Sequence, residues 1–250
     1  MNVSKNIARY TVSVLVLIAI WEMLVFILQM PEYVLPAPGK VIATLVSDYD
    51  VYAHEAGATL INMGVGGLIG ITLGVLVGLL IAYSRTLLWL AEPYLVIFQS
   101  FPREALIPLI VVWLGFGHGP KIVNAALLSF FPMAVITMNS LLDSRGEYLE
   151  LVRNWGASKW QEFIHCRLPY AIYPIAGGLK ITVPLALIGA VLGEFMGGNE
   201  GLGHVIVSSG ANFRLERSFA ALVVLSAIGI TSLACVRFLQ DVLLARFRQE

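Results

Sequence analysis

Long uncharged runs alternate with short charged segments along the chain. Six of these runs predict membrane-crossing helices, since about 20 apolar residues in a helix span a bilayer; they cover residues 10–28, 56–84, 105–117, 122–142, 168–193 and 218–236. The pattern therefore predicts an all-α, polytopic membrane protein with about six transmembrane helices. The third span is irregular, because the wider segment from Leu87 to Gly115 carries three prolines, Pro93, Pro102 and Pro108, as well as charged residues. It predicts either one broken helix or an interfacial helix that leads into a shorter span.

Composition supports this class of protein. Of the 250 residues, 58% are apolar and only 13% are charged, about half the charged fraction of a soluble domain. The net charge is zero, so no basic surface points to nucleic acid. Two cysteines and four histidines show no ligand spacing, and we expect neither a metal nor a disulfide. The first apolar run follows Lys5 and Arg9 like a signal peptide, but its length predicts a retained helix.

The distribution of basic residues predicts the orientation in the membrane. With both termini in the cytoplasm, nine Lys and Arg residues lie inside and four outside; the inner set is Lys5, Arg9, Arg85, Arg145, Arg153, Lys159, Arg167, Arg246 and Arg248, and the outer set is Lys40, Lys121, Arg214 and Arg217. We expect a multi-pass protein of a prokaryotic cytoplasmic membrane, surrounded by lipid. The chain then divides into an N-terminal helix with an external segment (1–54), a transmembrane domain (55–238) and a cytoplasmic tail (239–250).

Small residues form a stripe in the second span. Gly66, Gly70, Gly74 and Gly78 recur at every fourth position, which places them on one face of a helix where another backbone can approach closely. Packing inside the subunit is the favoured interpretation, and a subunit interface is the alternative.

The sequence has no signature of an enzyme. It contains no G-x-x-x-x-G-K-[ST] loop, no dinucleotide fingerprint and no H-E-x-x-H motif. The serines in the spans have no histidine at a matching depth. We expect a non-catalytic chain without a cofactor, so that any ATP it uses is hydrolysed by another chain.

The loop of residues 143–169 has an unusual pattern. Apolar residues recur at spacings of three and four on both sides of Gly156, which predicts two short amphipathic helices that meet at this glycine. Ser158 is positioned to cap the second helix. Such a pair either lies on the inner lipid headgroups or docks a cytoplasmic protein.

The same loop carries a family motif. Glu150, Gly156, Leu168 and Pro169 match, at the correct spacing, the E-A-A, three residues, G, nine residues, I-x-L-P loop of ABC importer permeases. Leu151 and Val152 replace the two alanines, and Cys166 replaces the isoleucine. The resemblance covers about residues 55–238. Leu35 to Pro38, Phe101 to Pro108 and Gly193 to Gly203 are similar to the branch of nitrate, taurine, aliphatic-sulfonate and thiamine-precursor permeases.

The resemblance implies a type I ABC importer transmembrane domain that moves a small polar or anionic solute. The implied partners are a second permease copy, two ATPase subunits that bind ATP and Mg, and a periplasmic or lipid-anchored binding protein. The implied ATPase-coupling residues are Glu150, Leu151, Val152, Trp155, Gly156, Ala157, Leu168 and Pro169.

Polar residues in the spans are candidates for a translocation path or gate. Gln99, Ser100, Arg103 and Glu104 cluster beside Pro102, where irregular backbone requires protein or a water-filled cavity around it. An Arg103–Glu104 ion pair that stabilises the kink is an equal alternative. Glu194, near Gly197 and Gly198, is expected either to fix a turn or to line the path.

Two other classes of function stay open. An autonomous secondary transporter or channel would need no ATPase, but the sequence has no convincing paired repeats with broken helices. A membrane scaffold would use the loop for recruitment without transport, and the polar cluster beside Pro102 argues against it.

Overall fold

The computed structural model describes residues 3–143 and 146–245, apart from the side chains of residues 3–11, 96, 99, 100, 146–148 and 243–245. Every described element is helical, which confirms the predicted all-α class. In chain order the elements are α1 (Val3–Leu28), α2 (Pro38–Ser47), α3 (Tyr49–Tyr83), α4 (Arg85–Ser100), η1 (Arg103–Leu106), α5 (Ile107–Leu114), α6 (His118–Leu142), α7 (Gly146–Asn154), α8 (Lys159–Glu162), η2 (Phe163–Arg167), α9 (Leu168–Gly197), α10 (Leu202–Ala211) and α11 (Leu215–Ala245).

Four of the helical stretches are long and apolar enough to cross a membrane. They are Tyr49–Tyr83, His118–Leu142, Lys159–Gly197 and Leu215–Val242. The first predicted span is the shorter apolar stretch Val12–Leu28 of α1. The third is divided into α4, η1 and α5, because Phe101 has extended backbone, the conformation that a following proline favours. Two short helices, α2 and α10, were not predicted.

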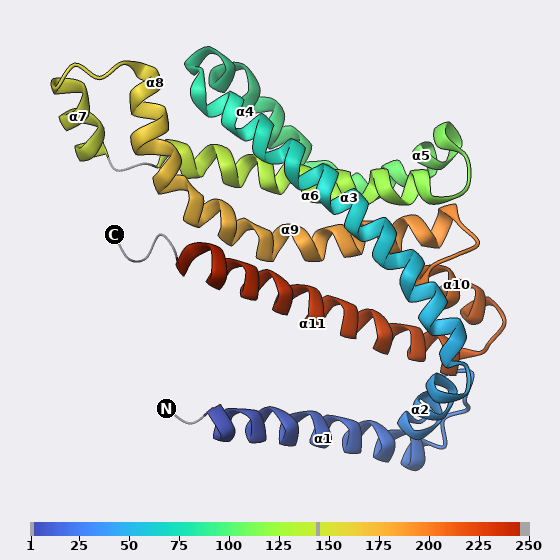
Figure 1. Cartoon of the computed structure of the whole chain (residues 1–250). Helices are drawn as coiled ribbons and strands as arrows, with labels where there is room; N and C mark the ends of the chain where they lie inside the picture. Colours follow the sequence, from blue (N-terminus) through green and yellow to red (C-terminus); the bar gives the residue numbers. More distant parts are fainter. Residues whose placement is uncertain (1–2, 144–145, 246–250) are drawn as a thin grey trace.

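The central part of the molecule is a layer of three packed helices, α3, α6 and α9 (Figure 1). The glycine stripe of α3 faces α6 inside the chain: a Cβ at Gly70 would lie 2.3 Å from the Ala126 carbonyl oxygen, and one at Gly78 would lie 2.6 Å from the Ala134 carbonyl oxygen. Only residues without a side chain permit this approach of two backbones. The glycines therefore pack α3 on α6 within one subunit.

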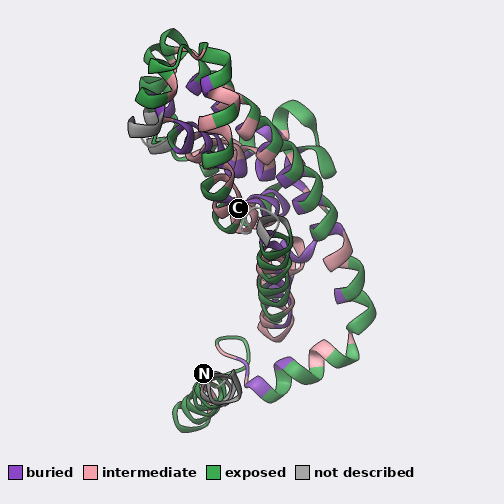
Figure 2. Ribbon diagram, turned by 60° about the vertical axis from the view of Figure 1, so that its left-hand side comes forward, coloured by how far each residue is buried: buried purple, intermediate pink, exposed green. Residues whose placement is uncertain are grey.

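The first helix lies apart from this layer. Its surface is largely exposed (Figure 2), and it meets α11 through Trp21 and Phe219, whose ring centroids are 5.5 Å apart. In Figure 1 the start of α1, the end of α11 and the α7–α8 segment lie at one end of the long helices, whereas α2 and α10 lie at the other. One end of the molecule is thus formed by the α7–α8 segment and the other by α2 and α10.

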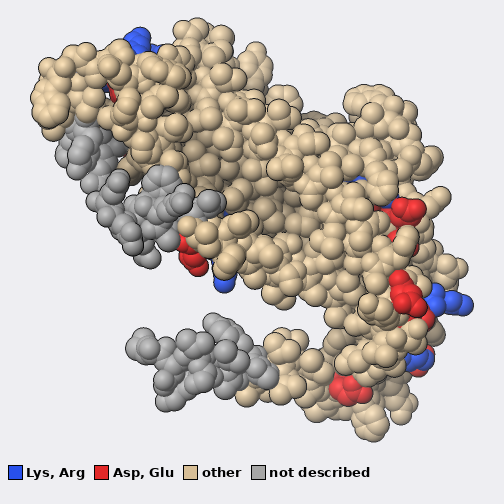
Figure 3. Space-filling view, in the orientation of Figure 1, with Lys and Arg blue, Asp and Glu red and all other residues tan. Residues whose placement is uncertain are grey.

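On the face of the molecule that Figure 3 shows, charged side chains gather toward these two ends, with a largely uncharged surface between them. At the α2 end, Arg217 pairs with Asp48 at 2.7 Å and Lys40 pairs with Glu32. An apolar belt between two polar ends is the surface that a bilayer requires. Of the predicted inner set, Arg153 and Lys159 belong to α7 and α8 at one end, whereas Lys40 of the predicted outer set belongs to α2 at the other (Figure 1).

Candidate functional site

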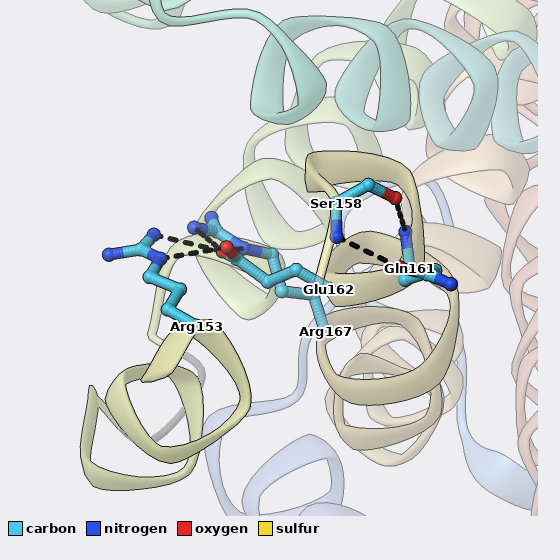
Figure 4. A network of polar contacts seen from close by, with 5 residues as sticks. All are labelled: Arg153, Ser158, Gln161, Glu162 and Arg167. Carbon is cyan, nitrogen blue, oxygen red and sulfur yellow. Dashed lines mark hydrogen bonds and ion pairs between the residues drawn. The ribbon is translucent and has the colours of Figure 1, made fainter. Parts of the chain in front are cut away.

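The α7–α8 segment is a bent pair of helices, as predicted. Gly156 lies at the bend with φ +80°, a left-handed conformation that costs other residues energy. Ser158 and Gln161 then form a reciprocal cap at the start of α8 (Figure 4): the Gln161 backbone N–H donates to Ser158 Oγ at 3.3 Å, and the Ser158 N–H donates to Gln161 Oε1 at 2.9 Å. These two features determine where α7 ends and α8 begins.

A buried carboxylate braces the pair. Glu162 of α8 accepts hydrogen bonds from Arg153 Nε of α7 at 2.8 Å and from Arg167 Nη2 of η2 at 2.7 Å (Figure 4). The hydrogen bond and the charge of Glu162 raise the pKa of the Arg153 guanidinium above its ordinary value. Charge-assisted bonds of this kind are strong and directional. Glu162 therefore connects α7 to the helix that continues through η2 into α9.

Aromatic contacts attach the segment to α3. The Tyr83 ring lies edge-on to Trp160 and to Phe163, with centroids 6.0 and 5.3 Å away. Leu149 is also buried, at 7% exposure. One face of the α7–α8 segment is thereby fixed to the rest of the molecule.

The opposite face is open. Trp155 is 83% exposed and Leu151 is 51% exposed, and a Cβ at Gly156 would meet no atom within 4 Å. Among the predicted coupling residues, the exposed ones are Glu150, Leu151, Trp155, Gly156 and Pro169, and the half-buried ones are Val152, Ala157 and Leu168. Exposed apolar side chains on a braced scaffold are typical of a surface that contacts another protein.

The polar cluster beside Pro102 lies at the break between α4 and α5. Arg103 Nη1 is buried and has no hydrogen-bond partner among the described residues, while Glu104 is exposed. No ion pair joins these two described side chains. Gln99 and Ser100 end α4, but their side chains lie outside the described residues. At the break, therefore, Arg103 Nη1 is a buried donor to which no described side chain or carbonyl is hydrogen-bonded.

Glu194 lies at the α2 end of α9, at 1% exposure. Its Oε2 accepts hydrogen bonds from Thr59 Oγ1 at 3.0 Å and from the Gly203 N–H at 2.9 Å, and its Oε1 accepts one from Asn62 Nδ2 at 3.0 Å. The Leu202 N–H donates to Thr59 Oγ1 at 2.9 Å. Of the two predicted roles, this geometry is that of a turn anchor, because the carboxylate joins α3, α9 and the start of α10.

The sequence analysis did not identify the hydrogen-bond partners of Glu194 or the ion-pair partners of Glu162. Thr59 and Asn62 stand three residues apart in an otherwise apolar span, and that spacing is the signal that could have identified them. The salt bridge between Arg153 and Glu162 crosses the bend at Gly156, whose angle the sequence does not specify.

Comparisons with known proteins all point to membrane components of transport systems. Residues 70–249 match the family model described as binding-protein-dependent transport system inner membrane component. A probable ABC transporter permease protein of Haemophilus influenzae is 34% identical over 93% of both chains. The formylaminopyrimidine transport permease protein ThiX of Halalkalibacterium halodurans is 34% identical over 94% of both chains. A putative aliphatic sulfonates transport permease protein, SsuC of Bacillus subtilis, is 29% identical over 92% of this chain and 84% of its own.

Solved structures agree on the fold. A structure described as inward-facing conformations of the MetNI methionine ABC transporter aligns with a TM-score of 0.63 at 23% identity. The alignment covers 76% of this chain and 92% of that chain. The helical arrangement is therefore that of an ABC importer transmembrane domain.

Proposed function

Because the chain belongs to the family of inner-membrane components of binding-protein-dependent transport systems, we propose that two copies of it form the membrane passage of an ABC importer. In this assembly each copy docks one ATPase on its α7–α8 segment, and a periplasmic or lipid-anchored binding protein delivers the solute. ATP and Mg bind to the ATPases, so the role of this chain is mechanical.

The proposal depends on two features of the α7–α8 segment: its exposed apolar side chains, and the ion pairs of Glu162 that hold the two helices together. Trp155 and Leu151 project from a segment that Glu162 holds through Arg153 and Arg167. A force applied to Trp155 passes through this brace into η2 and α9 rather than bending the loop. Since α9 packs against α6, the displacement reaches the helices that line the passage.

In the proposed orientation the α7–α8 end and both chain ends are cytoplasmic. The support is the positive-inside pattern, together with the position of Arg85, Arg153, Lys159 and Arg167 at the α7–α8 end. An ATPase in the cytoplasm then has direct access to Trp155.

The proposed cargo is a small polar or anionic solute. The named relatives transport a formylaminopyrimidine or aliphatic sulfonates, and the higher identity of the former makes a pyrimidine vitamin precursor the first candidate. Sulfonates, taurine and nitrate are the next candidates. The unpaired Nη1 of Arg103 at the break of the third span supplies a donor for a carbonyl, ring nitrogen or sulfonate oxygen.

Affinity purification from native membranes in mild detergent tests the assembly. We expect an ATP-binding subunit at a stoichiometry equal to that of this chain, and a co-purified binding protein whose ligand can be screened with pyrimidines and sulfonates. Recovery of a folded, monodisperse chain with no ATPase would contradict the proposal.

Uptake into proteoliposomes tests the cargo. The reconstituted complex should accumulate the ligand of its binding protein only with internal ATP, and Arg103→Gln should lower uptake more than Arg237→Gln, which changes an arginine in another span. Equal uptake by both variants would remove Arg103 from the path.

A further inference from the structure

A cavity of about 410 Å³ lies beneath the α7–α8 segment, where this segment faces the corner between α3 and α4. It belongs to neither the exposed Trp155 face nor the break at Pro102. Its walls come from six elements, α3, α4, α6, α7, α8 and η2; the lining residues are Ala82, Tyr83, Arg85, Leu88, Leu142, Arg153, Lys159, Glu162, Phe163 and Arg167.

The charge of this cavity is unbalanced. Four of its lining side chains are cationic and one, Glu162, is anionic. Glu162 forms ion pairs with Arg153 and Arg167, whereas Arg85 and Lys159 have no ion-pair partner among the described residues. Four like charges around one small volume repel one another unless an anion joins them. The four cations and one anion leave the lining with a net charge of +3, and this excess of positive charge is the electrostatics of an anion site.

The position of the cavity narrows the class of anion. Leu88, Leu142 and Phe163 give it apolar walls, and Tyr83 stands at the end of the membrane-crossing part of α3, where aromatic side chains meet lipid headgroups. The first turn of α4 also contributes Arg85 and Leu88 to the lining. Basic pockets between helices at a membrane surface bind phospholipid headgroups.

We propose that this cavity binds a phosphate group, supplied either by an anionic phospholipid headgroup or by free phosphate. The bound group joins Arg85 of the α3–α4 corner to Lys159 of α8. It thereby stiffens the connection between the α7–α8 segment and the membrane helices, and it makes coupling depend on the lipid around the transporter. Only that consequence rests on the proposed function, because binding is measured on the permease alone.

The test compares lipid retention among variants purified without the ATPase. The full chain is reconstituted in phosphatidylcholine nanodiscs with a minor fraction of phosphatidylglycerol, extracted again, and analysed for bound lipid by mass spectrometry. Arg85→Gln removes one unpaired cation, and Arg85→Gln with Lys159→Gln removes both. Arg85→Lys preserves the charge, and Lys40→Gln removes a cation at the opposite end.

A cation close to a membrane surface contributes about fivefold in affinity for an anionic headgroup. Retained phosphatidylglycerol should therefore fall about fivefold in the single variant and about 25-fold in the double variant, and stay unchanged in both controls. A titration with inorganic phosphate in pure phosphatidylcholine nanodiscs distinguishes the sources, since binding there that weakens in the same variants identifies free phosphate. Equal lipid retention in all variants together with no phosphate binding would overturn the proposal.

Discussion

Replacing Gly70 by alanine should separate α3 from α6. A Cβ at this position would lie 2.3 Å from both the Ala126 carbonyl oxygen and Ser129 Oγ, about 1 Å inside ordinary contact. The carbonyl belongs to the α6 backbone, so no side-chain rotation relieves the overlap. Overpacking of this kind costs about 1–3 kcal/mol.

Gly64→Ala is the matched control. It lies in the same helix, six residues earlier, and its Cβ would meet no atom within 4 Å. Alanine there should stabilise the helix by about 0.5–1 kcal/mol relative to glycine. Both variants add one methyl group and should move stability in opposite directions, with a difference of about 1.5–4 kcal/mol.

Thermal unfolding in detergent measures the difference. For a chain of this size it corresponds to roughly 3–16 °C in apparent melting temperature, with Gly70→Ala below the unmodified chain and Gly64→Ala at or above it. Equal melting temperatures for the two variants would refute the interpretation of the stripe as a close backbone contact within the subunit.

Three further variants test other parts of the structure. Gly156→Ala should cost about 1–2 kcal/mol at the φ +80° bend and lower uptake while the amount of protein in the membrane is unchanged; normal uptake would refute a requirement for this bend. Asn62→Leu removes a donor to Glu194 and should lower stability by about 1–3 kcal/mol, measured as melting temperature. Ser158→Ala removes the cap of α8 at a cost of about 1 kcal/mol. Hydrogen exchange at the start of α8 should therefore speed up, whereas Ser226→Ala, in another helix, should leave it unchanged.

Helices and their local breaks could be predicted because they depend on residues close in the sequence. The apolar runs located the long helices, the four-residue spacing located the glycine face, and the pattern around Gly156 located α7 and α8. The short helices α2 and α10 were missed, since each has only ten residues and no long apolar run. Local pattern is a weak signal at that length.

Contacts between distant segments could not be predicted. Thr59 lies 135 residues from Glu194 in the sequence, and the cavity beneath the α7–α8 segment is assembled from segments between Ala82 and Arg167. Their arrangement depends on how α3, α6 and α9 pack, and the positions of individual side chains follow only from that packing. The lack of a described hydrogen-bond partner for Arg103 Nη1 could likewise not be predicted, because it depends on the positions of the surrounding residues.

Docking of the ATPase on the exposed face of α7–α8 is the central claim, and one co-purification tests it most directly. Trp155→Glu places a charge in the middle of that face, where the side chain is 83% exposed; Trp113→Glu changes a 73% exposed tryptophan of α5, at the opposite end. Both variants should enter the membrane and elute as folded protein. We predict that Trp155→Glu loses most of the bound ATPase subunit while Trp113→Glu retains it. An undiminished amount of ATPase with Trp155→Glu would contradict the account.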